Sequence, residues 1–444
     1  MSKIQDDDKL WRLAKIIVDH HLKRSFTRYH VTGKENIPKE GACVFSSNHC
    51  NTLMDALVLI ASTWSKKVFI ARGDIFKNHT IAKILRWMRI LPIFRMRDGL
   101  NQVRDKNTDT IEQSIDVIHD EVPLFIFPEA AHRTKHSLRK LSKGIFHITL
   151  EANRRFGDEK PVYIVPVGLE YGDYFRFRST VLVNYGKPIN VTEYVKQHPE
   201  ENEVAVINEL KDILSEKMSH LITYLPDDED YDAMWEMTKM MVGNPAISLK
   251  ARLLRNKRMV SKIVEFRDKE PEKAKSLFAK VLEFTKHRKQ QSISVTSVAK
   301  RKPVWRTVWK TFLALLGLPF YLVAATASCP IWIISAFIRK NLKDKAFSNT
   351  ATFCVELFLH PLIMATGVTL LFCLVPWEIA VIGSIFLYYS YMIYLDYGQY
   401  IRLLTSDWRW IFNSDLRKEF KELGLWNFIK REKLIERLKT RNRP

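Results

Sequence analysis

Cysteine is scarce and scattered in this sequence. The 444 residues contain only five: Cys43, Cys50, Cys329, Cys354 and Cys373. Small secreted proteins that depend on disulfides have dense, even sets of cysteines, so this pattern argues against a disulfide framework. It favours a reducing compartment for the N-terminal half. Residues 1–9 contain three consecutive aspartates and no apolar core, so we expect no signal peptide there.

Acidic residues are outnumbered by basic ones. Lys and Arg total 70 against 49 Asp and Glu, which gives a formal net charge of +21. Such a charge calls for a polyanionic partner, but no nucleic-acid-binding motif is present, so we expect no nucleic acid. Because the chain also contains apolar segments of membrane length, an anionic lipid bilayer is the expected partner.

One short motif points to catalysis. His49 and Asp55 lie in the run SNHCNTLMD, residues 47–55, between a strand-like and a helix-like apolar segment. A carboxylate on the first turn of a helix can fix the tautomer of an imidazole and stabilise its cation. No Ser or Cys in a nucleophile-elbow pattern accompanies the pair, so we predict that His49 deprotonates a bound hydroxyl directly. The alternative is a helix capped by Asn48 or Asn51 that merely carries Asp55.

Three further segments accompany this motif. Residues 92–99 read PIFRMRDG, residues 124–129 read LFIFPE, and residues 162–168 read VYIVPVG. In order and spacing, the four blocks resemble the glycerophospholipid acyltransferase family, which includes lysophosphatidate and glycerol-3-phosphate acyltransferases. The resemblance covers roughly residues 8–190. It implies an α/β domain that moves a fatty acyl group from a thioester to a hydroxyl.

The resemblance also assigns roles to residues. His49 would be the general base, and Asp55 would orient it. Arg95 and Arg97, followed by Gly99, fall in the block that binds the acceptor's phosphate, which guanidinium groups match bidentately. The remaining predicted binding residues are Arg72 and Arg133 as further phosphate contacts, Glu129 in the acceptor site, and Pro166 in the wall beside it. We expect no metal and no cofactor, with acyl-coenzyme A or acyl carrier protein thioester as co-substrate.

The sequence departs from the family pattern at two places. Five residues separate His49 from Asp55, whereas four is the commoner spacing; some glycerol-3-phosphate-type members share the longer one. Glu129 is followed by Ala130 instead of the usual glycine. Because alanine enters a left-handed turn less easily than glycine, we expect the local backbone to differ.

Other interpretations of these residues stay open. Arg95 and Arg97 could form a solvated basic strand end, and Glu129 could be an acid favoured by a helix dipole. Glu129, His132 and His136 have a helical spacing that suits zinc, but no HExxH motif or cysteine pair supports a metal site.

Short β-branched segments alternate with helical ones up to about residue 191, which predicts an α/β domain over residues 1–190. The expected strands are residues 43–46, 68–71, 124–127, 162–167 and 181–185, with one more short strand before Arg95. Residues 10–26 predict a basic amphipathic helix, either docked on the domain or lying in a membrane interface. Residues 191–300 predict a charged helical subdomain and a linker.

The C-terminal part contains two long apolar stretches, in a membrane region expected over residues 301–400. Residues 311–338 carry no charge, contain two prolines and have basic flanks; this predicts a re-entrant or interfacial hairpin, with a tilted span as the alternative. Residues 350–397 are divided at Pro376, which predicts a two-span hairpin with both ends in the cytoplasm. Intramembrane ionisable groups are functional by default, and Glu356 and His360 fall in its first half.

The tail, residues 401–444, is basic and amphipathic. We expect an in-plane membrane helix there, with docking on the soluble part as the alternative. The whole chain is thus predicted to be a membrane-bound acyltransferase whose catalytic domain faces the cytoplasm. The predicted acceptor is glycerol-3-phosphate or lysophosphatidate. An amino-acid lipid or other non-glycerol acceptor is the near alternative, and a non-enzymatic membrane tether is the distant one.

Overall fold

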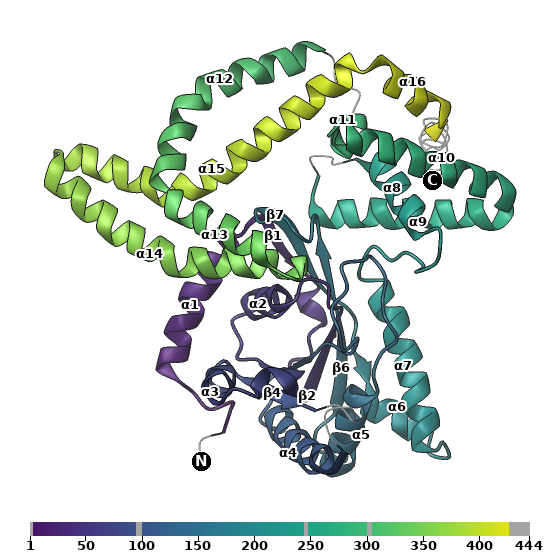
Figure 1. Ribbon diagram of the computed structural model, residues 1–444. Coiled ribbons are helices and arrows are strands. Elements are labelled where there is room, and N and C mark those ends of the chain that lie inside the picture. Colours follow the sequence, from purple (N-terminus) through teal and green to yellow (C-terminus); the bar gives the residue numbers. More distant parts are fainter. Residues whose placement is uncertain (1–2, 95–99, 244–246, 300–303, 426–444) are drawn as a thin grey trace, which may run out of the picture. The chain divides into compact units, whose positions relative to one another are not determined.

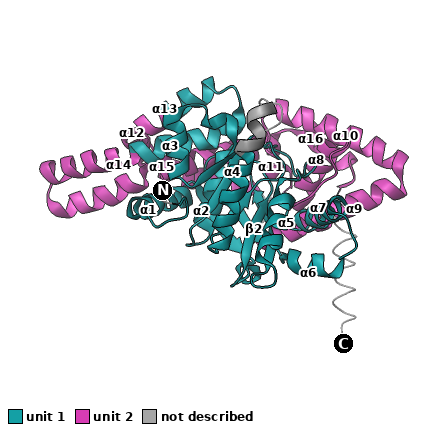
Figure 2. Ribbon diagram, turned by 90° about the horizontal axis from the view of Figure 1, so that it is seen from below, with its two compact units in different colours: residues 1–222, 334–359 teal, residues 223–333, 360–444 magenta. Residues whose placement is uncertain are grey.

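The computed structural model describes residues 3–94, 100–243, 247–299 and 304–425 (Figure 1). The chain forms two compact units (Figure 2). The first contains residues 1–222 and 334–359, and the second contains residues 223–333 and 360–444. The domain boundaries drawn from composition, at residues 190, 300 and 400, stay predictions.

The first unit is an α/β domain built on one eight-stranded sheet in the order β1-β7-β6-β2-β5-β3-β4, with β8 paired to β6. β2 is parallel to β5 and β6, and β3 is parallel to β4 and β5. β7 and β8 run antiparallel to β6. The strands are β1 (Phe26–Thr32), β2 (Ala42–Ser47), β3 (Val68–Arg72), β4 (Ile90–Ile93), β5 (Leu124–Ile126), β6 (Val162–Tyr171), β7 (Ser179–Tyr185) and β8 (Ile189–Asn190).

The predicted fold class, an α/β domain followed by helices, is confirmed. All six predicted strands are present, and β6 runs four residues beyond its predicted end at residue 167. β1 and β8 were not predicted. β1 lies at the end of the sheet order, only Phe26 of its residues is buried, and its other side chains are partly or fully exposed. An edge strand of this kind lacks the apolar run that marks a central strand.

Helices pack around this sheet. Those of the first unit are α1 (Lys9–Arg24), α2 (Leu53–Ser62), α3 (His79–Trp87), α4 (Leu100–His119), α5 (Gly144–Phe156), α6 (Val191–Gln197) and α7 (Glu203–Ser219). Val44, Leu124 and Ile164, on three neighbouring strands, are fully buried in the main hydrophobic cluster. Because β2, β5 and β6 are parallel, the loops that follow β2 and β5 leave the sheet at the same edge, where ligands bind in open α/β sheets.

α1 has two different faces. Trp11 and Leu22 are buried, and an internal ion pair joins the buried side chains of Lys15 and Asp19, with Nζ 2.5 Å from Oδ2. Four apolar side chains remain exposed on the other side: Leu10, Leu13, Ile16 and Ile17. The helix is therefore docked on the domain and still presents the apolar stripe expected of an interfacial helix.

The second unit is helical. A methionine-rich core, with Met234, Met237 and Met240, joins its soluble helices. Its helices are α8 (Tyr231–Val242), α9 (Leu249–Lys269), α10 (Pro271–Gln290), α11 (Val295–Ala299), α12 (Val304–Ala327), α15 (Trp377–Phe412) and α16 (Ser414–Glu422), while α13 (Cys329–Asn341) and α14 (Ser348–Leu374) belong partly to each unit.

The described part of the tail differs from the expected in-plane helix. Leu416, Phe420 and Leu423 are buried in the core of the helical unit, and the ring of Phe420 lies 5.4 Å from that of Phe284 on α10. These apolar side chains are used for protein packing, so residues 414–425 follow the docked alternative. The rest of the tail lies outside the described residues.

Three helices are long and apolar enough to cross a membrane: α12, α14 with the turn before it, and α15. The predicted uncharged stretch breaks at Ser328 into α12 and α13, so the choice between hairpin and span there stays a prediction. α14 and α15 meet at Pro376 as predicted, and Gly367 on α14 lies directly against Leu387 on α15. α12 packs on α15, where the Tyr397 hydroxyl donates to the carbonyl of Ala314.

Candidate active site

The predicted imidazole–carboxylate pair is present where β2 ends. His49 Nδ1 lies 2.8 Å from Asp55 Oδ2. The side chain of His49 is 20% exposed, whereas that of Asp55 is completely buried. Because Nδ1 faces the carboxylate, an acceptor-only group, this nitrogen carries the proton. Nε2 of neutral His49 is therefore left with the lone pair that a general base needs.

Asp55 is fixed by more than His49. Its Oδ2 also accepts the backbone N–H groups of Cys50 at 2.8 Å and Asn51 at 2.7 Å. Its Oδ1 accepts the hydroxyl of Tyr171, in β6, at 2.8 Å. Burial raises the pKa of Tyr171 well above its usual range, so the hydroxyl stays protonated and donates. The carboxylate therefore has one orientation, with one oxygen aimed at the imidazole.

The helix-cap alternative for this motif is wrong. The side chain of Asn48 bridges to β6, donating to the carbonyl of Leu169 at 3.1 Å and accepting its N–H at 2.7 Å. The residue before α2 is Thr52, which has a positive φ of 49° and makes no capping hydrogen bond. The loop is thus held by Asp55 and by β6, which is typical of a functional turn under strain.

The loop after β5 clamps the backbone of His49. Glu129, only 5% exposed, accepts the N–H of His49 at 3.1 Å and that of Arg139 at 3.0 Å. The N–H of Arg133 donates to the carbonyl of His49 at 2.9 Å. Burial raises the pKa of Glu129. The nearest following helix, α5, begins at Gly144, so Glu129 is not an acid at a helix N-terminus. It is a part of the site that orients His49.

Ala130 takes the left-handed turn that its residue type disfavours. Its φ is 58°, and its N–H donates to the carbonyl of Phe127 at 3.2 Å. The expectation that alanine would divert the backbone here is therefore wrong: the tight turn forms, and the surrounding contacts of Glu129 and Arg133 hold it.

We expect Ala130→Gly to stabilise the protein by about 0.5–1 kcal/mol, because alanine pays ~1–2 kcal/mol in the left-handed region and glycine's greater unfolded-state freedom offsets only part of this. Ala130 is exposed, so no packing is lost. Thermal unfolding in detergent measures the shift. Ala131→Gly, at a neighbour without a positive φ, is the control and should destabilise slightly; equal losses in both variants would contradict the strain argument.

The predicted phosphate ligands are only partly described. Arg95, Arg97 and Gly99 lie outside the described residues, so their roles stay predictions. Arg72, at the end of β3, forms a two-point ion pair with Asp74, its Nε lying 3.1 Å from Oδ1. Half of the Arg72 side chain is exposed. An anionic substrate would therefore have to compete with Asp74 for this guanidinium.

Pro166 and the zinc alternative can be placed as well. Pro166 is buried within β6, opposite Ser46 of β2, and its carbonyl accepts the N–H of Gly186 at 2.8 Å. The three residues with zinc-like spacing face different partners. Glu129 takes backbone N–H groups, His132 Nε2 faces Asp344, and His136 Nδ1 lies 3.7 Å from Glu170.

Two residues of the site were missed by sequence reasoning. Tyr171, which donates to Asp55, follows it by 116 residues, and only the pairing of β6 with β2 brings the two together. Phe127 stacks on the imidazole of His49, with ring centroids 4.4 Å apart and planes 22° apart. Phe127 stands in the quoted block before Glu129, so its position was visible, but its contact with His49 was not.

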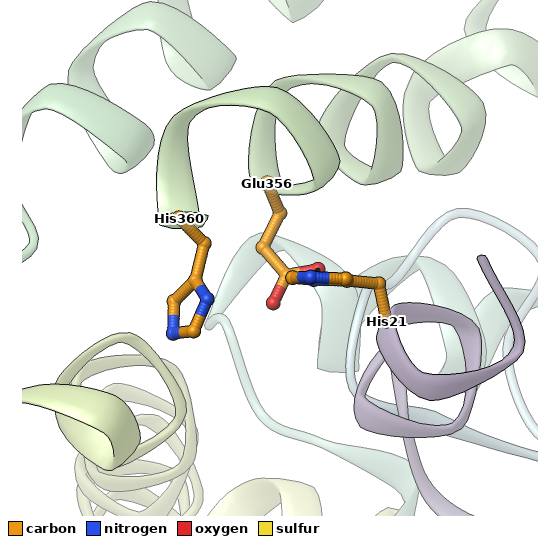
Figure 3. Close-up of side chains that lie close together, drawn as sticks. All are labelled: His21, Glu356 and His360. Carbon is orange, nitrogen blue, oxygen red and sulfur yellow. Dashed lines mark hydrogen bonds and ion pairs between the residues drawn. The ribbon is translucent and has the colours of Figure 1, made fainter. Parts of the chain in front are cut away.

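Glu356, the ionisable residue predicted inside an apolar segment, has partners on α1. Its Oε1 accepts Arg24 Nε at 3.0 Å, and its Oε2 lies 3.1 Å from His21 Nδ1. Figure 3 shows Glu356 beside His21, with His360 one turn farther along α14. Because a guanidinium occupies one carboxylate oxygen, Glu356 is the acceptor of a buried ion pair.

Comparison with known proteins agrees with this geometry. Residues 28–170 match the family model named Acyltransferase. This part of the chain is an acyltransferase-family domain. The match begins in β1 and ends in β6, and it includes His49, Asp55 and Glu129.

Two individual proteins show the same likeness. Glycerol-3-phosphate O-acyltransferase 2 of Saccharomyces cerevisiae is 29% identical over 132 residues, which cover 29% of this chain and 17% of that protein. The chain therefore matches only a small part of that relative. The crystal structure of the 1-acyl-sn-glycerophosphate (LPA) acyltransferase PlsC from Thermotoga maritima aligns with a TM-score of 0.33 at 16% identity, covering 49% of this chain and 83% of that one.

Proposed function

We propose that this protein transfers a fatty acyl group from a thioester to a hydroxyl of glycerol-3-phosphate or lysophosphatidate. The observation that carries the proposal is the His49–Asp55 pair, 2.8 Å apart at the carboxyl end of β2. It lies in an acyltransferase-family domain whose curated relative is named for glycerol-3-phosphate acylation. The residue types and their arrangement suit direct proton abstraction from an alcohol.

In this mechanism, Nε2 of His49 takes the proton of the acceptor hydroxyl while the oxygen attacks the thioester carbon. The resulting oxyanion needs hydrogen-bond donors, for which backbone N–H groups are the expected source. When the carbon–sulfur bond breaks, the imidazolium returns the proton to the leaving thiolate. The products are an ester and a free thiol of coenzyme A or acyl carrier protein. Asp55 holds the imidazole in one tautomer and stabilises its cation throughout.

A lipid-side supply of substrate fits the rest of the chain. The protein contains three helices of membrane length, and α1 of the catalytic unit exposes an apolar stripe next to basic residues. Such a stripe binds bilayer interfaces, with anionic headgroups adding attraction for Lys and Arg. We propose a membrane location with the catalytic unit on the cytoplasmic face, where coenzyme A and acyl carrier protein thioesters are available. Arg95 and Arg97 are the proposed phosphate ligands.

An acceptor panel tests this proposal. Full-length protein in detergent or vesicles would be given labelled acyl-coenzyme A or acyl carrier protein with glycerol-3-phosphate, lysophosphatidate, an amino-acid lipid and a simple alcohol. Acylation of one of the two phosphate-bearing acceptors supports the proposal. Acylation of the amino-acid lipid or the alcohol alone would replace the acceptor class. Vesicle binding without any turnover would support the membrane tether instead.

A further inference from the structure

A second imidazole–carboxylate pair lies beside the first. His132 Nε2 is 2.9 Å from Oδ2 of Asp344. His132 belongs to the loop after β5, and Asp344 lies 212 residues later, between α13 and α14, in the part of that connection that belongs to the catalytic unit. Asp344 also accepts the N–H of Ala346 at 2.9 Å and so caps the short turn Lys345–Phe347.

The connection between α13 and α14 contacts the catalytic loop. The ring of His132 lies 5.9 Å from that of His49 and 5.9 Å from that of Phe347, both edge to face. The hydroxyl of Thr52 lies 3.3 Å from that of Thr350. A segment that joins two apolar helices thus forms a wall beside His49, and His132 stands between that wall and the catalytic base.

Asp344 determines which nitrogen of His132 carries a proton. The N–H of Ala346 and the imidazole of His132 lower the pKa of Asp344, so it is an ionised carboxylate that can only accept. Nε2 of His132 is therefore the donor, and Nδ1 of the neutral ring is an acceptor. Among the described residues, no hydrogen bond to this Nδ1 is found. A cationic His132 would oppose the charge that His49 gains during proton abstraction, so the neutral form suits the reaction.

We propose that His132, oriented by Asp344, accepts a hydrogen bond from a second hydroxyl of the acceptor while His49 deprotonates the first. This rests on the proposed function. A hydroxyl bound to an imidazole nitrogen lies about 2.8 Å from it, and a centroid separation of 5.9 Å between the two rings lets two hydroxyls on neighbouring carbons reach one imidazole each. Glycerol-3-phosphate has two such hydroxyls, and lysophosphatidate has one.

Asp344 is a positioning residue in this proposal, and Asp344→Asn tests it. An asparagine oxygen still caps the turn at Ala346, but its NH₂ group faces His132. Nε2 must then accept, and the proton moves to Nδ1, which can no longer accept from the acceptor. The KM for glycerol-3-phosphate should rise about tenfold, the loss expected when one hydrogen bond leaves a polar group unpaired, while kcat and the KM for lysophosphatidate stay unchanged.

Two further variants separate orientation from structure. His132→Phe removes the acceptor and should raise the same KM, whereas His132→Asn, with an amide oxygen near the position of Nδ1, should restore part of it. Asp173→Asn is the matched control, because Asp173 is a turn aspartate of the same unit that accepts the N–H of Phe175 and Arg176. It should leave both acceptors unaffected.

The ratio of the two KM values decides the outcome. Equal losses on both acceptors, or no change in either, would overturn the assignment of His132 to a second hydroxyl. Loss on lysophosphatidate alone would overturn it as well. Failure of the proposed function would show differently, as absence of acylation of either acceptor by the unchanged protein in the same assay.

Discussion

Replacing His49 by alanine should reduce kcat about 10²–10⁴-fold, the contribution expected of a general base, while the protein stays folded. In barrier terms this is about 3–5 kcal/mol. The KM of the acceptor should change little, because the imidazole acts on the hydroxyl in the transition state more than it binds the ground state.

The fold should survive this change, because the contacts that hold residue 49 are made by its backbone. Its N–H donates to Glu129, and its carbonyl accepts from Arg133. Alanine keeps both. Cys50 and Asn51 continue to donate to Asp55, so the carboxylate keeps partners when the imidazole is gone. Only the stacking of the ring on Phe127 is lost.

His119→Ala is the matched control. His119 also pairs with a neighbouring carboxylate, Nδ1 lying 3.4 Å from Asp120 Oδ1, but its side chain is 62% exposed and follows α4 on the surface. Initial rates with labelled acyl donor, at saturating acceptor, compare the two variants. If His49→Ala retains activity near that of His119→Ala, His49 is not the base and the mechanism fails.

The catalytic pair could be predicted because its chemistry is local. His49 and Asp55 are six residues apart, and a strand-to-helix turn brings them together almost irrespective of the rest of the fold. Glu129 was predicted from its block, although its actual contact, a clamp on the backbone of His49, needs the parallel pairing of β2 with β5. Sequence patterns thus located the residues better than their hydrogen bonds.

Contacts between distant segments were not predictable. Tyr171 reaches Asp55 across 116 residues, and Asp344 reaches His132 across 212. Both depend on the order of strands or the path of a connection, which periodicity does not encode. The exposed apolar stripe of α1 and its buried polar side were likewise read as alternatives, although the structure shows both on the same helix.

The largest effect on stability is expected at Glu356. Its side chain is 1% exposed, and those of its partners Arg24 and His21 are 5% and 6% exposed. Glu356→Ala would leave the guanidinium of Arg24 buried without this counter-charge. Breaking a buried pair in this way costs about 3–5 kcal/mol. For a unit of this size the apparent melting temperature falls ~2–4 °C per kcal/mol.

The measurement is thermal unfolding of the full chain in detergent, with a drop of about 6–20 °C expected for Glu356→Ala. Glu378→Ala is the matched control, because Glu378 also belongs to an apolar helix but is exposed at the start of α15. It should change little. A melting temperature for Glu356→Ala equal to that of the control would show that the pair with Arg24 contributes nothing.

A double variant separates the loss of the pair from the stranding of a charge. Replacing Arg24 and Glu356 together by methionine removes both charges and keeps apolar volume, so most of the stability should return. The recovery would show that the pair acts chiefly by fixing how α14 meets α1. That register matters to the site, because Glu356 lies on the same helix as Thr350, which contacts Thr52 beside His49. Glu356→Ala should therefore also lower kcat at temperatures where the protein is still folded, and the double variant should recover activity together with stability.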